Sequence, residues 1–330
     1  MSGSDPLRQK LIQTLTTGAV VTVTASLALV GCGWLGSRTS DTGRRQDRTT
    51  PQLVVLSEAH RFMATRIGGD SVTVDLQVVE AEGSPQKPPA RESILAMHNA
   101  DRILVNGNGQ EPWLEKVSLP EDKLVELSSG EWNEVASAPR GMGHRHGPGG
   151  AMHRHGLVTR PWLDLKVATH QVQTLREALS ALSPEDEPLF RKRAAVLNHE
   201  LALLDHQFQV TVDQFSGLTV LVVGHDLSAF SQRYGLKTVP VLERPDDEPE
   251  LFLQELEQKR GANAAALLLL TAPLPVKLQQ PVENLGFLPI VLHNGVETDS
   301  AGDFLELLRI NRQTLDGVVS GALSPSAPER

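Results

Sequence analysis

The chain has 330 residues, of which 40% are hydrophobic and 22% are charged, and its formal net charge is −9 at pH 7. This length accommodates two domains of ordinary size, and the composition is typical of a globular protein rather than of a disordered or fibrous one. The negative balance argues against a nucleic-acid-binding protein, which normally presents a basic face.

The first residues have the features of an export signal. Arg8 and Lys10 precede an uncharged stretch over residues 11–31, which ends in LVG and is followed by Cys32. About 20 apolar residues span a bilayer, so an uncleaved anchor is one interpretation. The ending also resembles a bacterial lipobox, in which an aliphatic and a small residue precede a cysteine that becomes lipidated. We therefore expect a lipoprotein signal peptide over residues 1–31 and a lipid on Cys32, the only cysteine.

An N-terminal lobe is expected after a polar segment. Residues 32–51 contain few apolar side chains and indicate a flexible tether. An apolar run at 53–56 predicts a strand, residues 66–79 a turn followed by an alternating strand, and residues 100–107 a strand that ends in turn residues, with helical stretches between them. Strands that alternate with helices favour a parallel sheet, so we assign an α/β lobe to residues 52–182.

Residues 141–156, GMGHRHGPGGAMHRHG, have no periodicity that could build a core. They carry His144, His146, His153 and His155. Imidazole is a good ligand for Zn²⁺, so this histidine-rich loop is a candidate metal-collecting segment. The other interpretation is a solvated spacer whose histidines are incidental.

One long helix is predicted over residues 183–215. Ser183 followed by Pro184 is typical of a helix start, with the serine hydroxyl as cap. Apolar residues then recur every three or four positions, which predicts one buried stripe. The stripe consists of Phe190, Ala194, Leu197, Leu201, Leu204, Phe208, Val212 and Phe215. His199 and His206 lie seven positions apart on this helix and either face solvent or share a metal.

The remaining sequence predicts a second α/β lobe over residues 216–320, followed by a disordered tail at 321–330. Continuous apolar runs typical of buried parallel strands occur at 218–224, 236–242, 264–270 and 289–294. Helices are predicted at 248–261 and 303–319. The fold class is therefore α/β: two Rossmann-like lobes with parallel sheets, joined by one long central helix, with a ligand cleft between the lobes at the carboxyl ends of the strands.

Motifs of catalysis are not found in the sequence. It lacks a Gly-x-Ser-x-Gly elbow, a phosphate loop ending in Gly-Lys-Ser/Thr, the zinc motif H-E-x-x-H and a dinucleotide fingerprint. We therefore expect that the protein is not an enzyme.

Five segments resemble, in order, motifs of the zinc and manganese solute-binding lipoproteins of bacterial ABC importers. They are IGGDSVTV at 67–74, ADRILVNGNGQEPWLEK at 100–116, the segment from WLD at 162 to LLD at 205, FSQRYGLKTVPVL at 230–242 and GDFLELLRINRQTLDGV at 302–318. The resemblance implies capture of Zn²⁺, or of Mn²⁺ or another divalent metal, in the interlobe cleft.

The same resemblance implies delivery of the metal to the permease and ATPase of an importer. It further implies a monomer that is exported and anchored to the membrane by its lipid, facing the periplasm or the cell exterior. Zinc members of that family carry a histidine-rich loop just before the WLD segment, which is where residues 141–156 lie.

The four metal-ligand positions of the family are altered in this sequence. Pro85 or Gln86 stands where the first histidine is expected, and Arg160 stands at the second. His225 lies one position from the third, and His293 replaces the acid at the fourth. A guanidinium stays protonated and has no lone pair for a metal. His225 and His293 are therefore the cleft ligand candidates, unless they are ordinary histidines at strand ends.

An alternative function follows from these substitutions. The chain would then be a degenerate paralogue on the same scaffold without metal in its cleft, acting as an interaction partner or binding another ligand.

Overall fold

The computed structural model describes residues 50–77, 87–128, 144–145, 152–153, 160–224, 226–241, 245, 248–260, 264–296 and 303–321. Thr49–Arg330 form one compact unit. Cys32 and the expected leader and tether lie outside the described residues, except Thr50 and Pro51 at the end of the tether. Among the described residues no helix is long and apolar enough to cross a membrane.

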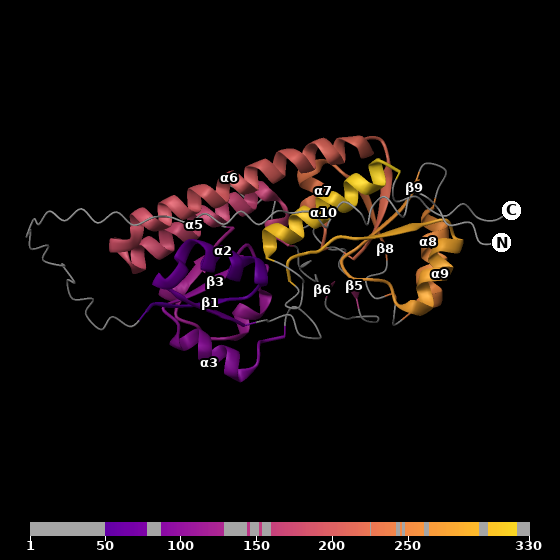
Figure 1. The fold of residues 1–330 in the computed structure, drawn as a ribbon. Helices are drawn as coiled ribbons and strands as arrows, with labels where there is room; N and C mark the ends of the chain where they lie inside the picture. The colour runs from indigo at the N-terminus through magenta and orange to yellow at the C-terminus, as the bar shows by residue number, and fades with distance from the viewer. Residues whose placement is uncertain are drawn as a thin grey trace, which may run out of the picture. The chain divides into compact units, whose positions relative to one another are not determined.

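The first lobe is built on a parallel sheet of four strands in the order β2-β1-β3-β4 (Figure 1). Leu53 and Val55 of β1 face one apolar cluster, and Val54 faces another. This alternation places α2 on one face of the sheet and α3 on the other. The elements are β1 (Gln52–Val55), α2 (Glu58–Gly68), η1 (Gly69–Ser71), β2 (Thr73–Leu76), α3 (Arg91–Asn99), β3 (Arg102–Val105), η2 (Pro112–Lys116), η3 (Glu121–Lys123) and β4 (Leu124–Glu126).

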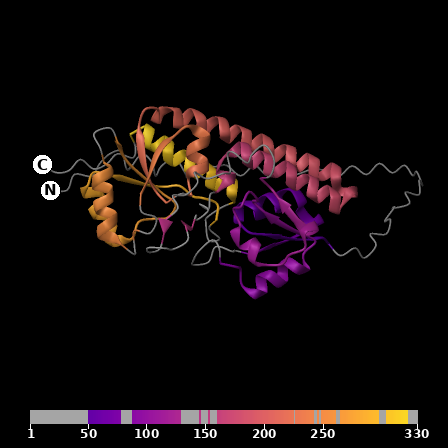
Figure 2. The ribbon, with the colours of Figure 1, turned by 180° about the vertical axis from the view of Figure 1, so that it is seen from behind.

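The second lobe repeats this topology. Its parallel strands lie in the order β10-β9-β7-β8, which is the first lobe's order read from the other edge. Val220 and Val222 of β7 face the large cluster under the linking helices, while Leu221 faces α8 and α9. Figure 2 shows the second lobe from behind, with α8 and α9 in orange. The elements are β7 (Thr219–Val223), α7 (Ser228–Tyr234), β8 (Lys237–Val241), α8 (Pro249–Lys259), β9 (Ala264–Leu270), α9 (Val276–Asn284), β10 (Leu288–Val291) and α10 (Phe304–Val319).

Two long helices join the sheets and lie side by side, as Figure 1 shows. They and the turns at their ends are η4 (Pro161–Leu163), α5 (Leu165–Leu182), η5 (Pro184–Asp186), α6 (Glu187–Val212) and η6 (Asp213–Phe215). All eight residues of the predicted apolar stripe are buried. His199 and His206 are both exposed on α6. The predicted serine cap is wrong, because the Ser183 side chain caps neither η5 nor α6.

Four residues of the histidine-rich segment are described. Its described residues form a two-stranded antiparallel ribbon of β5 (His144–Arg145) and β6 (Met152–His153). The register pairs His144 with His153. His146 and His155 lie outside the described residues. This short pairing is compatible with the predicted loop, because two residues a side build no core.

Candidate metal site

The site lies where loops follow parallel strands of the second sheet. Asp226 comes shortly after β7, and Asn294 comes shortly after β10. The carboxyl ends of parallel strands meet at one edge of a sheet, which is where ligands bind in open α/β folds. The Asn294 amide donates a hydrogen bond to Asp226 Oδ2 at 3.0 Å. The two loops are thus joined, although β9 separates their strands.

Arg160 reaches this edge from the segment that precedes α5. Its residue is 7% exposed, and its Nη2 lies 3.5 Å from Asp226 Oδ1. The guanidinium carbon also lies 6.0 Å from the centre of the Trp162 ring, within cation–π range. The second predicted ligand position therefore holds a buried cation that is paired with a carboxylate.

Trp162 fixes the Asn294 loop from the same segment. Its indole Nε1–H donates to the Asn294 carbonyl at 2.6 Å. Gly295 follows with φ of +77°, and a Cβ there would stand 3.0 Å from Trp162 Nε1. The Gly295 carbonyl accepts a hydrogen bond from the Ala59 amide, at the start of α2, at 3.2 Å. Residues 294–295 are therefore held between the second sheet, the start of α2 and the segment that precedes α5.

His293 is held by its backbone. Its N–H donates to Asn311 Oδ1 at 2.7 Å, and its carbonyl accepts from Asn311 Nδ2 at 2.8 Å. Asn311 is buried on α10. This double hydrogen bond sets the end of β10 and the direction in which the chain continues into Asn294. His293 itself is half-buried and adjacent to the interaction network.

The predicted ligands are brought together only in part. Arg160 pairs with Asp226, which in turn accepts a hydrogen bond from Asn294; these two residues adjoin the predicted His225 and His293 in the sequence. His225, Pro85 and Gln86 lie outside the described residues. Within the described part of the chain, no group of three or more His, Cys, Asp or Glu side chains is arranged to hold a metal ion.

A second charged cluster supports the segment that carries Arg160 and Trp162. Asp164 caps α5 and lies 3.6 Å from Nε of Arg233. Arg233 also pairs with Asp205 of α6. Burial raises the pKa of Asp164, and hydrogen bonds from two backbone amides and the charge of the Arg233 guanidinium offset part of this increase. Arg233 therefore links α7 of the second lobe to both linking helices. Its contact with α5 is made at Asp164, two residues beyond Trp162.

His60 is a buried residue that the sequence analysis did not identify. It lies on α2 just after β1, is fully buried and meets the Trp162 ring edge-on at 5.1 Å between centroids. Neither ring nitrogen has a hydrogen-bond partner of good geometry. Burial lowers the pKa of His60 from 6.5 to about 4, and the neighbouring Gln171 side chain offsets part of this effect. The imidazole is therefore neutral at physiological pH, and it packs against Trp162, the tryptophan of the site.

Glu111 occupies the corresponding edge of the first sheet. It accepts hydrogen bonds from the backbone and side chain of Asn106, both at 2.9 Å, and from the Gly107 amide at 3.1 Å. Burial raises the pKa of Glu111 to about 7, although these hydrogen bonds lower it; the nearby Glu126 charge adds to the increase. The carboxyl group organises the turn that follows β3. The run NGNGQE was its only signal in the sequence.

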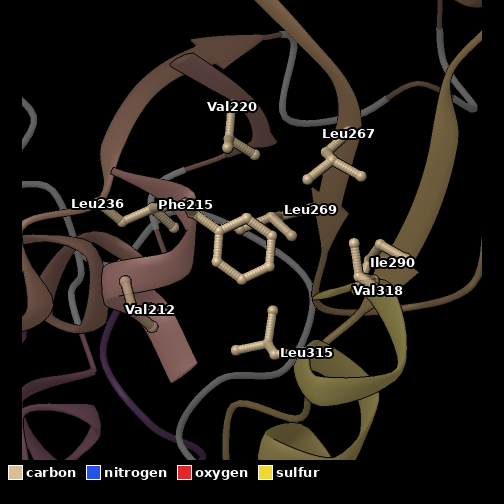
Figure 3. Close-up of a pocket in the computed structure, with 9 residues that line it drawn as sticks. All are labelled: Val212, Phe215, Val220, Leu236, Leu267, Leu269, Ile290, Leu315 and Val318. Carbon is tan, nitrogen blue, oxygen red and sulfur yellow. The ribbon is translucent and has the colours of Figure 1, made fainter. Parts of the chain in front are cut away.

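A small cavity elsewhere in the second lobe is not part of this site. Figure 3 shows apolar side chains from the end of the linking helix, the second sheet and α10, among them Phe215, Ile290 and Leu315. The cavity has a volume of about 10 Å³. That volume accommodates about one water molecule and offers it no polar partner, so the space is a packing defect.

Comparison with known proteins agrees with the expected family. Residues 54–317 match the family model described as zinc-uptake complex component A, periplasmic. A zinc-binding lipoprotein, AdcA of Streptococcus pneumoniae, is 24% identical over 209 residues, which are 62% of this chain and 41% of the relative. The chain thus spans about two fifths of that relative's length.

Two further proteins are similar. The manganese-binding lipoprotein MntA of Halalkalibacterium halodurans is 23% identical over 68% of this chain and 69% of its own length. The crystal structure of the Zn(II)-bound ZnuA-like domain of Streptococcus pneumoniae AdcA superposes with a TM-score of 0.64 at 19% identity, covering 84% of this chain and 100% of that domain. At this identity the superposition establishes the fold. Because the family model covers most of the chain, the protein belongs to the ZnuA family of periplasmic zinc-uptake components.

Proposed function

We propose that this chain binds a divalent metal ion, zinc in the first place, as the substrate-binding component of an ABC importer. The observation that supports this proposal best is the hydrogen bond between Asn294 and Asp226, which joins the loops after β10 and β7 at the carboxyl edge of the second sheet. The loops that carry His225 and His293 thus lead to the place where α/β folds bind ligands. The family match and the zinc-bound relative make a metal ion the natural solute.

The donor groups near this edge suit zinc better than manganese. His225 and His293 offer imidazole nitrogen, and Asp226 offers carboxylate oxygen. Zn²⁺ favours a tetrahedral set of nitrogen, sulfur and carboxylate ligands, whereas Mn²⁺ favours oxygen-rich sites. Two imidazoles, one carboxylate and a water molecule make a four-coordinate zinc site. Arg160 must move away from Asp226 before that carboxylate can serve as a ligand.

The histidine-rich loop is assigned an accessory role. His144, His146, His153 and His155 collect zinc loosely near the cleft and pass it inward. The site itself needs fixed ligands, and a glycine-rich segment loses conformational entropy when it orders around an ion. Deletion of residues 141–156 should therefore slow loading more than it weakens binding at equilibrium.

The partners follow from the same proposal. Export, cleavage before Cys32 and lipidation of that residue anchor the protein at the outer side of the membrane. The loaded form then docks on the permease of the importer, whose ATPase drives uptake. Capture and delivery of the metal ion need no covalent chemistry by this chain, so it is assigned no catalytic residue.

Equilibrium dialysis with Zn²⁺ and Mn²⁺ tests the proposal. The full chain should bind one zinc ion tightly, and a His225→Ala, His293→Ala double variant should bind it at least a hundredfold more weakly. A His199→Ala, His206→Ala variant is the matched control, since it removes two exposed imidazoles from α6. Unchanged tight binding in the first double variant refutes the cleft assignment.

The Arg160–Asp226 ion pair favours one second candidate, the metal-free paralogue. A cation already present at the second ligand position opposes another cation. On this alternative, all zinc binding disappears when residues 141–156 are deleted, while the double variant of His225 and His293 behaves as wild type. The same dialysis series therefore separates the two functions.

A further inference from the structure

Arg160 connects parts of the chain that are distant in sequence. Its guanidinium pairs with Asp226 Oδ1, and the other oxygen of that carboxylate accepts the Asn294 amide. Two residues after Arg160, the Trp162 indole donates to the Asn294 carbonyl. Four residues therefore form a closed circuit of contacts between the start of α5 and two loops of the second sheet.

The two charged side chains of the circuit are sufficiently shielded from solvent that the loss of either charge affects the stability of the other. The Arg160 side chain is 9% exposed and that of Asp226 is 25% exposed. Removing one partner of a buried pair leaves the other charge without compensation, which costs far more than the loss of an exposed pair. The Arg160 guanidinium, the more buried of the two charges, therefore depends on Asp226, and the carboxylate in turn is stabilised by a positive charge, either a guanidinium or a metal ion.

Only the guanidinium is a permanent part of the chain. Arginine remains protonated throughout the physiological range, so its charge does not depend on the supply of an ion. We propose that Arg160 serves as an internal cation that holds the second-lobe loops against the α5 segment and α2 without any metal. This closure device goes beyond the proposed function, and its consequence for zinc is competition: a metal ion reaches Asp226 only by displacing Arg160.

The Ala59 amide reports directly on the closed state. It lies in the first turn of α2, where backbone N–H groups have no partner within the helix. Its hydrogen bond to the Gly295 carbonyl is therefore its source of protection from solvent exchange. Hydrogen exchange at this amide measures whether residues 294–295 remain docked.

The experiment compares exchange at Ala59 in the full chain with a chelator present. Wild type should protect this amide equally with chelator and with zinc. Arg160→Gln removes the charge and should raise the exchange rate at least tenfold in the metal-free protein, and Asp226→Asn should do the same. Arg160→Lys restores the charge and should recover part of the protection. Arg176→Gln is the control, since Arg176 pairs with Glu177 and Glu187 away from the site.

The outcomes are distinct. Protection in wild type that appears only after zinc is added would overturn the proposal, as would Arg160→Gln protein that stays protected with chelator present. The same proteins are titrated with zinc after the chelator has been removed, and Arg160→Gln should bind zinc at least tenfold more tightly than wild type. Equal zinc affinities of Arg160→Gln and wild type would refute the competition between Arg160 and zinc, but would not affect the conclusion from hydrogen exchange. Failure of the proposed function is seen separately, as the absence of tight zinc binding in the dialysis series.

Discussion

His60 makes the stability of this protein depend on pH in a defined window. The pKa of this imidazole is lowered from 6.5 to about 4 on folding, because the side chain is fully buried. Because the pKa of His60 is lower in the folded state, the unfolded chain binds more protons between pH 6.5 and pH 4. The unfolding free energy is therefore highest above pH 6.5 and decreases as the pH falls towards 4. The difference between these two pKa values corresponds to about 3 kcal/mol of unfolding free energy over the whole window.

Replacement of His60 by phenylalanine should remove this dependence. The ring keeps its edge-on contact with Trp162, and two buried nitrogens without good hydrogen bonds are lost. Between pH 7.5 and pH 5, wild type should lose about 2 kcal/mol more unfolding free energy than the variant. Because phenylalanine is slightly larger than histidine, only the change with pH is predicted, and His60→Gln provides a second variant without a titrating ring.

Urea denaturation followed by circular dichroism at several pH values measures this difference. His98→Gln is the control, since His98 is exposed on α3. Its unfolding free energy should follow wild type at every pH. If His60→Phe and His60→Gln also keep the wild-type pH dependence, the imidazole is not buried in the neutral form and the reasoning is wrong.

Three further changes test other parts of the fold. The raised pKa of Glu111 means that its ionisation destabilises the folded state, so the unfolding free energy should fall as the pH rises from about 4.5 to about 7. Glu111→Gln should abolish this fall, which denaturation at pH 5 and pH 8 measures. Gly69→Ala should destabilise the protein by about 1–3 kcal/mol, since φ is +56° and a Cβ would stand 2.6 Å from the Arg193 guanidinium; thermal melting measures this, and an unchanged Tm contradicts it. Phe208→Ala should cost about 3–5 kcal/mol by opening a cavity under α6, and a loss below about 1 kcal/mol in urea denaturation would show that the stripe is not tightly packed.

Much of the fold is predictable because the relevant patterns are local. The stripe from Phe190 to Phe215 follows the period of one helix, and all of its members are buried. The apolar run at 264–270 coincides with β9. The three-residue strand β4 was not predicted, since Leu124–Glu126 is too short to carry a period. Ser183 has the residue type of a cap, but its hydroxyl accepts no hydrogen bond from an amide at the start of the helix.

The candidate site was predictable only to the level of its loops. The motifs identify the strands after which ligand residues come. Asp226 and Asn294 join the circuit, and the sequence analysis did not name them. His225 lies outside the described residues, and the role of His293 stays a prediction. His60 gave no signal and Glu111 only the turn-forming run that precedes it, because burial, which shifts their pKa values, is set by distant parts of the chain.

The sequence by itself determined the two α/β lobes, the long linking helix and the family, since periodicity and motif order are written along the chain. It also determined that Arg160 stands where a metal-ligating histidine is expected. Only the tertiary structure decided what that arginine does. Trp162 and Asn294 are 132 positions apart, and their contact, like the Arg160–Asp226 pair, exists only when both sheets are folded and joined. Charge pairing depends on distance in space, which the order of residues does not contain.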